Sequence, residues 1–421
     1  MGLSADGREQ FRLDNHVVAG RSRKNDPLRV LIAGGGVAAL EALIALRRLA
    51  EERVSIEFLA REPQFWYRPL AVAEPFGIGH LHGLDLSAIA DEFGAAVTLG
   101  ALESVDAQRH IARTSAGAEF SYDVLLIAVG ARPVEAVPGA FTFRGPADAE
   151  GFGRLLAEAE NGRVRRLAFA VPGAVAWPLP LYELALQAGA RLGRRRGATE
   201  LTLVTHEERP LQLFGPGASE AMATLLAERG VQVRLRSYPV AFSEGSLSLA
   251  PNGSVAADRV VALPRLSGPA LEGVPHAAGF IPTDRSGRVR GLADVFAAGD
   301  ATAFPVKQGG LAAQQADAAA EAIASLAGAE LTPQPFRPVL RGLILTGGAP
   351  LFARAELTAT GDQFGAGTEA LWWPPGKIVG RYLGAFLAER SGLILTPPSE
   401  REALQVEVDL SPLTNSLPPV G

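Results

Sequence analysis

Strand-like apolar runs alternate with amphipathic segments along most of the chain. Residues 28–36 are a short apolar run that ends in three glycines. Residues 37–50 place apolar side chains at helical spacing and close on Arg47 and Arg48, which suit a helix C-terminus. Residues 54–60 are again strand-like. This order predicts a strand, a glycine turn, a helix and a second strand, which is a βαβ unit.

A second region repeats the same layout. Its predicted elements are strands at 166–172, 200–205, 231–236 and 258–264 and helices near 181–192 and 219–229. Before it, residues 120–133 predict a buried strand ending in Gly130. After it, the apolar run 293–300 leads into a long Ala-rich helix at about 309–326. The second unit is therefore predicted to be inserted into the first.

The fold class predicted from this pattern is α/β, with two Rossmann-like dinucleotide-binding domains and a partly β C-terminal cap. The predicted boundaries are a polar tail at 1–26, the first domain at 27–145 and 276–330, the inserted domain at 146–275, the cap at 331–394 and a Pro-rich tail at 395–421.

The composition narrows the chemistry. The 421 residues include no cysteine, which excludes disulfides, Cys redox pairs, iron–sulfur clusters and Cys nucleophiles. Six scattered histidines without an HxxxH pair argue against a transition-metal site. If the protein is a redox enzyme, its electrons must reside on an organic cofactor.

Charge and hydropathy bear on partners and location. A net charge of −5 argues against nucleic acid as a partner. No apolar stretch approaches the roughly 18 residues needed to span a bilayer, and the N-terminal residues lack a signal-peptide core. We therefore expect a cytoplasmic protein, with peripheral contact at the inner membrane face as an alternative.

The glycine turn after the first strand fits the dinucleotide pattern GxGxxG/A at Gly34, Gly36 and Ala39. The first position allows a tight turn, the second lets the backbone approach a pyrophosphate, and the third allows close helix packing. The pyrophosphate would then lie on the helix N-terminus at Val37 and Ala38. The position of the usual ribose-binding acid is Ala60. Glu62 is the best substitute, unless it is a solvated loop carboxylate.

A second candidate turn follows the strand at 293–298. Gly299 allows close approach to a cofactor, and Asp300 can accept hydrogen bonds from its hydroxyl groups. The helix N-terminus near residues 307–311, which includes Gly309, would project positive potential toward an electron-rich ring. The alternative is that Asp300 is a simple turn residue.

Together these pieces resemble the FAD-dependent pyridine nucleotide–disulfide oxidoreductase superfamily. Within it, the chain looks most like the sulfide:quinone oxidoreductases and type II NADH dehydrogenases. The matching stretches are VLIAGGGVAALEAL, FWYRPLAVAEPF, DVLLIAVGARP and DVFAAGDATAFPVKQGG, in the family's order over residues 28–320. The resemblance implies that the first and third segments bind FAD and that the middle domain usually binds NAD(P)H.

The sequence departs from the family pattern in the middle domain and in its cysteines. Pro172, Pro178 and Pro180 replace the phosphate turn and remove N–H donors, while Glu207 stands where a ribose-binding acid belongs. NAD(P)H binding is therefore open but not favoured. Because the sulfide-oxidising branch depends on cysteines, ordinary sulfide:quinone oxidoreductase activity is not expected. Of the quinone-associated glutamines of the NADH dehydrogenases, only the pair at 314–315 is kept.

The resemblance also suggests residues near the flavin ring. Lys307 and Gln308 are best placed to approach it, although Lys307 can also be a solvated loop lysine. Glu183 resembles the acid that the family uses beside the nicotinamide; as a helix-surface carboxylate it would need no function. Pro69, flanked by Arg68, is expected to shape the wall over the ring. Lys307 and Glu183 are the candidate catalytic residues.

Residues 372–390 carry two tryptophans and an apolar helical stripe from Ile378 to Leu387. This stripe suits a membrane interface, a helix that covers the flavin domain, or a homodimer contact. Packing within the protein or a dimer is favoured.

The leading functional hypothesis is an FAD-dependent oxidoreductase that passes electrons from a small donor through flavin to an acceptor such as a quinone. One alternative is an NAD(P)H-dependent FAD reductase with an irregular nucleotide turn. Another is a flavin-binding sensor or partner subunit without turnover.

Overall fold

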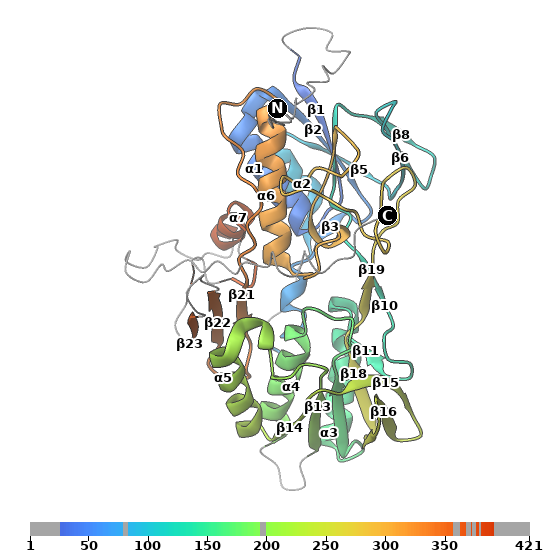
Figure 1. Ribbon diagram of the computed structural model, residues 1–421, viewed down its shortest axis with the longest axis vertical. Helices are drawn as coiled ribbons and strands as arrows, with labels where there is room; N and C mark the ends of the chain where they lie inside the picture. Colours follow the sequence, from blue (N-terminus) through green and yellow to red (C-terminus); the bar gives the residue numbers. More distant parts are fainter. Residues whose placement is uncertain are drawn as a thin grey trace, which may run out of the picture.

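The computed structural model describes residues 26–78, 83–193, 199–356, 363–367, 372, 376–378 and 380–390. The two predicted tails lie outside these residues, apart from Asp26. The chain forms two lobes stacked along the long axis, the upper one built from the N-terminal region together with α6 (Figure 1).

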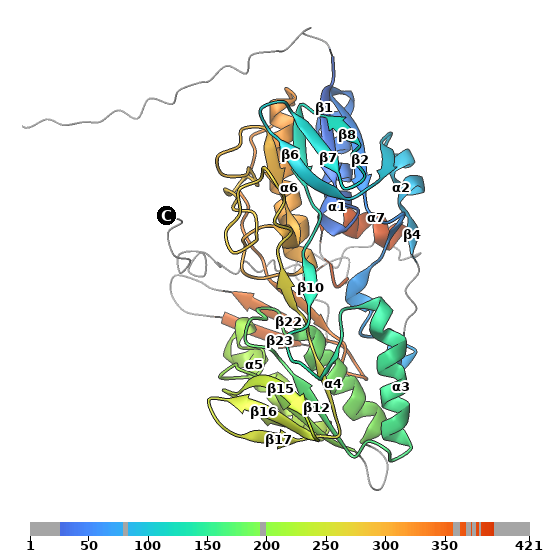
Figure 2. The same cartoon turned by 90° about the vertical axis from the view of Figure 1, so that its right-hand side faces the viewer.

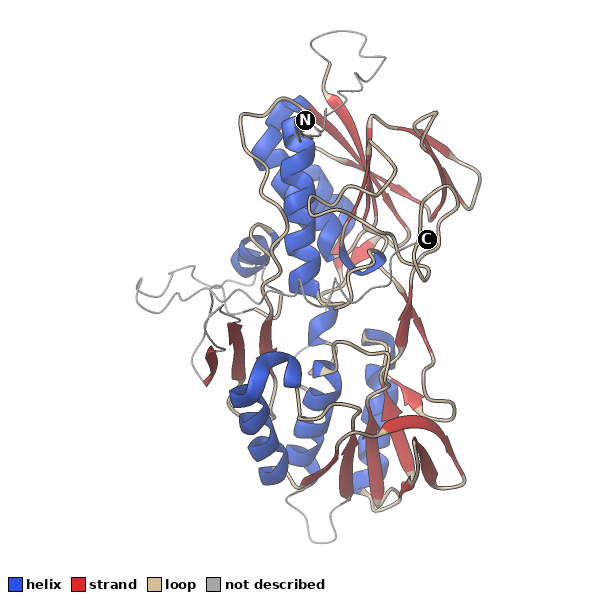
Figure 3. Cartoon of the chain, viewed as in Figure 1, coloured by secondary structure: helices blue, strands red, loops and turns tan. Residues whose placement is uncertain are grey.

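The upper lobe contains a five-stranded sheet in the order β20-β9-β1-β2-β5. All its neighbouring strands are parallel. The strands are β1 (Leu28–Ala33), β2 (Val54–Ala60), β5 (Ala96–Leu99), β9 (Val124–Ile127) and β20 (Val295–Ala297). Helices α1 (Val37–Ala50) and α6 (Gly309–Leu326) lie side by side along one face (Figure 3). The strands read as nearly continuous apolar runs because both faces of the sheet are covered.

The lower lobe repeats this plan with the order β11-β18-β12-β13-β14, again entirely parallel. Its strands are β11 (Phe141–Thr142), β12 (Arg166–Ala170), β13 (Glu200–Val204), β14 (Val231–Arg234) and β18 (Arg259–Ala262). Its helices are α3 (Ala149–Glu160), α4 (Leu179–Leu192) and α5 (Gly215–Glu228). A small antiparallel sheet, β15 (Tyr238–Ser243), β16 (Ser246–Ala250) and β17 (Ser254–Ala256), flanks it.

Two antiparallel strands connect the lobes: β10 (Arg132–Val134) leads down and β19 (Arg265–Ser267) leads back (Figure 2). The lower lobe is thus an insertion in the upper one, and the prediction of two α/β units of Rossmann type is confirmed. The residue boundaries given above for the domains stay predictions.

The predicted strand at 120–133 is divided in the structure. A short antiparallel sheet, β6 (Leu102–Asp106), β7 (Ile111–Thr114) and β8 (Glu119–Ser121), ends before β9 begins. Between β8 and β9, the Asp123 carboxylate accepts the Arg29 backbone N–H at 2.8 Å and pairs with the Arg29 guanidinium. Gly130 follows β9 with a φ of +71° and ends the run. The side chain of Asp123 therefore satisfies the backbone of the neighbouring strand at this break.

The C-terminal region contributes to both lobes. The antiparallel strands β21 (Arg341–Ile344), β22 (Leu351–Glu356) and β23 (Gln363–Gly367) lie beside α5, and α7 (Leu383–Arg390) lies against α1 (Figure 1). Tyr382, Leu383 and Phe386 are buried in the core formed by α1 and α6. The described residues Ile378, Tyr382, Leu383 and Phe386 of the apolar stripe therefore pack within the protein.

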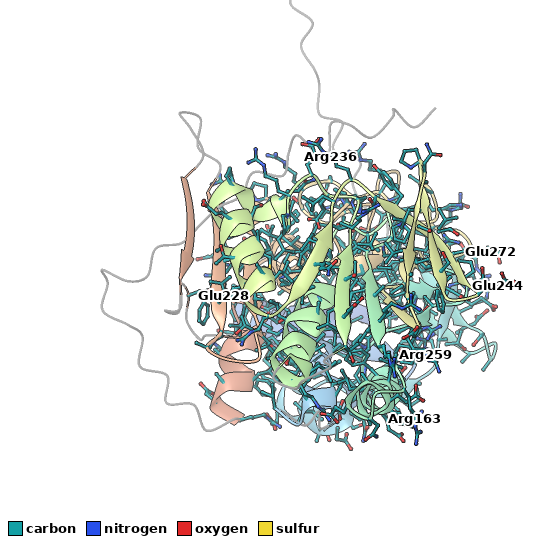
Figure 4. All side chains as sticks on the ribbon, turned by 90° about the horizontal axis from the view of Figure 1, so that it is seen from below. Arg163, Glu228, Arg236, Glu244, Arg259 and Glu272 are labelled. Atoms are coloured by element: carbon teal, nitrogen blue, oxygen red, sulfur yellow. The ribbon has the colours of Figure 1, made fainter. Side chains whose placement is uncertain are left out.

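No helix in the described ranges has the length and apolar character needed to cross a membrane. Seen from below, labelled side chains of both charge signs, among them Arg163, Glu228, Arg236 and Arg259, stand around the outside of the lower lobe (Figure 4).

Candidate functional site

The turn between β1 and α1 brings backbone against backbone. Gly34 has a φ of +138°, and a Cβ there would lie 2.2 Å from the Ala128 carbonyl oxygen, so only glycine fits. A Cβ on Gly36 would meet no atom within 4 Å. Gly36 is also the N-cap of α1 and makes no side-chain cap. The first-turn N–H groups of α1, at Val37 and Ala38, therefore face open space that an anionic group can enter.

The turn after β20 packs against the first turns of α1 and α6. Gly299 has a φ of +77°. A Cβ at this position would lie 3.3 Å from the Ala38 Cβ and 3.4 Å from the Ala312 Cβ. The Gln315 Oε1 accepts the Gly299 N–H at 2.7 Å and fixes the turn. The first turns of α1 and α6 and the Gly299 turn therefore converge at the carboxyl ends of the strands, where ligands of doubly wound sheets bind.

Asp300 lies beside two cations. Burial raises the pKa of its carboxyl group, and the charges of Lys307 and Arg68 oppose that rise. Within the described ranges no protein group donates a hydrogen bond to its carboxylate.

Lys307 and Gln308 have partners within the protein. The Lys307 ammonium donates to the Thr302 carbonyl and lies 4.1 Å from the centre of the Phe280 ring. Burial lowers the pKa of Lys307 to about 8, and Asp300 opposes the shift. The Gln308 side chain caps α6, its Oε1 accepting the Leu311 N–H at 2.8 Å. The Gln308 amide thus serves the helix, and Lys307 faces the Asp300 side of the site.

The other predicted binding residues differ in their exposure to solvent. Gly130 has a φ of +71° and no atom within 4 Å of its missing Cβ. Arg68 and Pro69 begin the short 3₁₀ helix Arg68–Leu70, with Arg68 exposed and Pro69 half-buried. Glu62 is exposed two residues beyond β2. Ala39 is fully buried in the core of α1.

Glu183 is a buried group at the junction of the lobes. It stands in the second turn of α4 and is 1% exposed. Its Oε1 accepts the Leu345 backbone N–H at 2.8 Å and the Lys377 ammonium at 2.5 Å. Burial raises the pKa of Glu183, while the charge of Lys377 opposes the rise. The structure therefore excludes the interpretation of Glu183 as a helix-surface carboxylate.

The residues next to Lys377 tie this ion pair to the start of α6. The Ile378 N–H donates to the Tyr67 hydroxyl oxygen at 2.8 Å. A Cβ on Gly309 would lie 3.0 Å from the Ile378 side chain, so the two residues are in contact. The Glu183–Lys377 pair therefore lies where α4, the segment at 67–69 and the N-terminus of α6 come together.

A model of the pyridine nucleotide-disulphide oxidoreductase family matches residues 28–323, more than half of the chain. The chain belongs to this family. Like its other members, the protein is an FAD-dependent oxidoreductase.

Solved structures share the family fold with this chain. The sulfide:quinone oxidoreductase of Aquifex aeolicus is 20% identical with a TM-score of 0.74, over 81% of this chain and 87% of that one. A ferredoxin reductase from Rhodopseudomonas palustris is 20% identical with a TM-score of 0.64, over 80% and 84%. A NAD-dependent persulfide reductase from A. fulgidus is 18% identical with a TM-score of 0.61, over 79% and 65%.

The upper lobe of this oxidoreductase fits FAD. The open space at Gly36 and the uncapped start of α1 suit its pyrophosphate, and Asp300 offers acceptors for its hydroxyl groups. The N-terminus of α6, at Gly309, would face the electron-rich end of the ring. These are the residues that we expect to hold the cofactor.

The lower lobe does not fit the pyridine nucleotide that the family name implies. A Cβ on Gly173 would lie 2.7 Å from the Tyr238 ring, so this ring lies against the turn between β12 and α4. Pro178 is the N-cap of α4 and Pro180 stands in its first turn, where neither offers an N–H to a phosphate.

Glu207, the candidate ribose-binding acid of the lower lobe, already accepts hydrogen bonds from side chains of the protein. Glu207 is buried, and its Oε2 accepts the hydroxyl groups of Tyr182 at 2.6 Å and Thr205 at 2.9 Å. Burial raises the pKa of Glu207 against the effect of these donors. Trp177 packs on Phe214, with ring centres 5.6 Å apart, and lies partly buried against the core of this lobe.

The glutamine pair at the flavin helix is engaged as well. Gln315 holds the Gly299 turn, and the Gln314 amide exchanges hydrogen bonds of 2.9 and 2.8 Å with the Val339 backbone. Both side chains therefore fasten neighbouring backbone, and neither supports a quinone site.

The sequence analysis missed Lys377 as a site residue. A signal for it exists, because the chain has only three lysines, Lys24, Lys307 and Lys377, among its 40 basic residues. Two of the three lie at the candidate site in a protein that otherwise uses arginine. An ammonium group changes its protonation readily when buried, whereas a guanidinium does not.

Proposed function

We propose that this FAD-dependent oxidoreductase accepts electrons from a small donor other than NAD(P)H and passes them to a small acceptor such as a quinone. Two observations support the exclusion of the common donors. Tyr238 lies against the nucleotide turn of the lower lobe, and Pro178 and Pro180 at the start of α4 offer no N–H to a phosphate. The chain has no cysteine, so a thiol relay to the flavin has no residue to use.

The observation that carries the proposal is the buried Glu183–Lys377 pair. Bound FAD supplies an acceptor and donor of electron pairs at this junction. Reduction of a quinone consumes protons along with electrons, and a buried ion pair in which burial raises the carboxyl pKa offers a group that can hold and release a proton. Lys377 and Glu183 are in this proposal the residues that keep and deliver that proton.

Lys307 has a different part in the proposal. Its charge lies next to Asp300, and its pKa of about 8 allows it to remain protonated at neutral pH. A cation there adds positive potential to that of the α6 N-terminus. This arrangement favours a reduced, electron-rich ring.

The test is an anaerobic spectral titration of the purified holoprotein with NADH, NADPH, sulfide and a short-chain quinol. We expect the quinol or sulfide to bleach the flavin band and the two nucleotides to leave it unchanged. Bleaching by either nucleotide at stoichiometric concentration would overturn the choice of donor and favour the NAD(P)H reductase alternative. A holoprotein that no donor bleaches would favour the sensor alternative.

A Glu183→Gln variant tests the proton role. We expect quinone reduction to slow while the flavin content stays that of the wild type. Glu150→Gln is a matched control, because Glu150 also forms a 2.5 Å ion pair, with Arg154, but on the surface. An equal effect of the two substitutions would count against a catalytic role of Glu183.

A further inference from the structure

The residues after Lys377 are fastened to α1 by one buried carboxylate. We define the C-terminal strap as the described residues 376–378 and 380–390. Glu41 of α1 is fully buried, and its two oxygens accept the N–H groups of Tyr382 at 2.7 Å and Leu383 at 2.9 Å. Because α7 begins at Leu383, Glu41 satisfies free N–H groups at the start of a helix that is distant in sequence.

Gly380 shows how closely the strap passes over this carboxylate. A Cβ at that position would lie 2.1 Å from the Glu41 Oε2. Glu41 could yield only by giving up its bonds to the strap, since its side chain has no exposed surface. The sequence at 380 is therefore restricted by Glu41.

A second carboxyl group completes the anchor. Asp317 of α6 lies next to Glu41, whose proximity adds to the rise of the Asp317 pKa, and the Asp317 Oδ1 is buried with no hydrogen-bond partner in the described ranges. Two carboxyl groups in contact cannot both be charged at low cost, so the pair shares a proton. The other titratable groups facing Asp317 are Glu321 on α6 and Arg381 on the strap, with Tyr382 alongside.

The anchor lies only a few residues from the site. Gly380 follows Lys377 by three residues, a span of at most about 11 Å. Between them, the Ile378 N–H is held by the Tyr67 hydroxyl group. The strap thus joins Glu183 of the lower lobe to Glu41 of the upper lobe. The contacts of the strap with Tyr67 and Glu41 hold Lys377 close to Glu183.

We propose that Glu41 is a positioning residue that, with the proton of Asp317, holds the strap so that Lys377 remains paired with Glu183. The part of this inference that concerns turnover rests on the function proposed above. The part that concerns the anchor does not, and it can be measured without turnover.

The experiment uses the scarcity of lysine. The holoprotein is acetylated with a small amine-reactive reagent, and the rate at each of the three lysines is followed by peptide mass spectrometry. In the wild type, Lys377 should react slowly because its side chain is 6% exposed. Loss of hydrogen bonds to a buried charged group shifts an opening equilibrium by roughly tenfold or more. We expect Glu41→Gln and Gly380→Ala to raise the Lys377 rate by that factor and to leave Lys307 unchanged.

Two further variants are the controls. Asp317→Asn keeps a neutral donor beside Glu41, and we expect it to retain the slow wild-type rate at Lys377. Glu92→Gln removes the contact of Glu92 with Arg390 at the far end of α7, and it should also leave the rate unchanged. Gly380→Ala leaves both carboxyl groups in place. It therefore still tests the anchor if Glu41→Gln fails to fold.

The outcomes separate the two proposals. Slow labelling of Lys377 in a folded Gly380→Ala or Glu41→Gln variant would overturn the anchor. Fast labelling together with a loss of kcat similar to that of a Lys377→Met variant supports the anchor and the role of Lys377. Fast labelling with unchanged turnover supports the anchor and overturns the proposed role of Lys377 in catalysis.

Discussion

The Glu183–Lys377 pair gives a prediction whose size and sign both follow from the structure. The two charges lie 2.5 Å apart, and their side chains are 2% and 6% exposed. Removing one partner of such a buried pair typically costs about 3–5 kcal/mol, because the other charge is left without compensation. We expect Lys377→Met and Glu183→Gln each to lower the free energy of unfolding by that amount near neutral pH.

The stability deficit of the Lys377→Met variant should depend on pH. In Lys377→Met the pKa of Glu183 rises further, because the cation that opposed the rise is gone. A carboxyl group whose pKa is higher in the folded protein than in the unfolded chain stabilises the folded state at pH values below its unfolded pKa. This stabilisation is lost as pH rises through the pKa of the folded state. The Lys377→Met deficit therefore grows with pH.

The assay is chemical unfolding of the flavin-loaded variants, followed by flavin and tryptophan fluorescence at about pH 6 and about pH 8. The double variant should lose less than the sum of the single losses, since removing both charges leaves neither uncompensated. Glu150→Gln, in its exposed pair with Arg154, should cost less than about 1 kcal/mol. Additive losses, or a Lys377→Met deficit that does not change with pH, would refute this account of the pair.

Three further results are expected. Gly34→Ala should abolish FAD retention, since the new Cβ would lie 2.2 Å from the Ala128 carbonyl oxygen. Gly153→Ala is the control, because its Cβ would meet no atom within 4 Å, and it should retain the flavin. The ratio of flavin to protein absorbance in the purified variants measures the retention. Tyr238→Ala should remain inert to NADH and NADPH in anaerobic titration because the prolines of α4 still lack N–H groups; bleaching of this variant alone would mean that the Tyr238 ring is the whole barrier. Burial raises the pKa of Asp317 from 3.8 to about 9, so the contribution of Asp317 to folding stability declines as pH rises between these values. Asp317→Asn should flatten the dependence of the melting temperature on pH over this range. An unchanged slope would contradict this prediction.

The elements around the upper sheet could be predicted from sequence because local and tertiary signals agree there. The predicted helices at 37–50 and 309–326 match α1 and α6, whose N-termini follow glycine turns and whose apolar residues face one core. The strand at 54–60 likewise matches β2. The family resemblance followed from these same segments.

The C-terminal part could not be predicted in this way because distant residues determine it. The apolar stripe suggested a helix from Ile378, but α7 begins at Leu383. The reason is that the Ile378 N–H is bound by Tyr67 and the N–H groups at 382–383 by Glu41. Such contacts leave no periodic signal.

The candidate site shows the same division. The positions of Gly34, Gly36 and Gly299 at tight turns followed from their places after strands. The partners of polar side chains did not: Gln308 caps its helix, and Glu183 meets a lysine 194 residues away in sequence. Short motifs specify backbone shape, whereas the pairing of buried charges depends on how the lobes and the strap meet.

The strap has a consequence for the order in which the protein matures. Domains fold from the N-terminus as the chain leaves the ribosome. All strands of both parallel sheets precede residue 298, and α6 ends at Leu326, so the flavin lobe can form while Lys377 is still to be synthesised. A nascent or prematurely ended chain could therefore bind the cofactor without the ion pair at Glu183. The Glu183–Lys377 junction is therefore completed only after the segment that contains Lys377 and α7 has been synthesised.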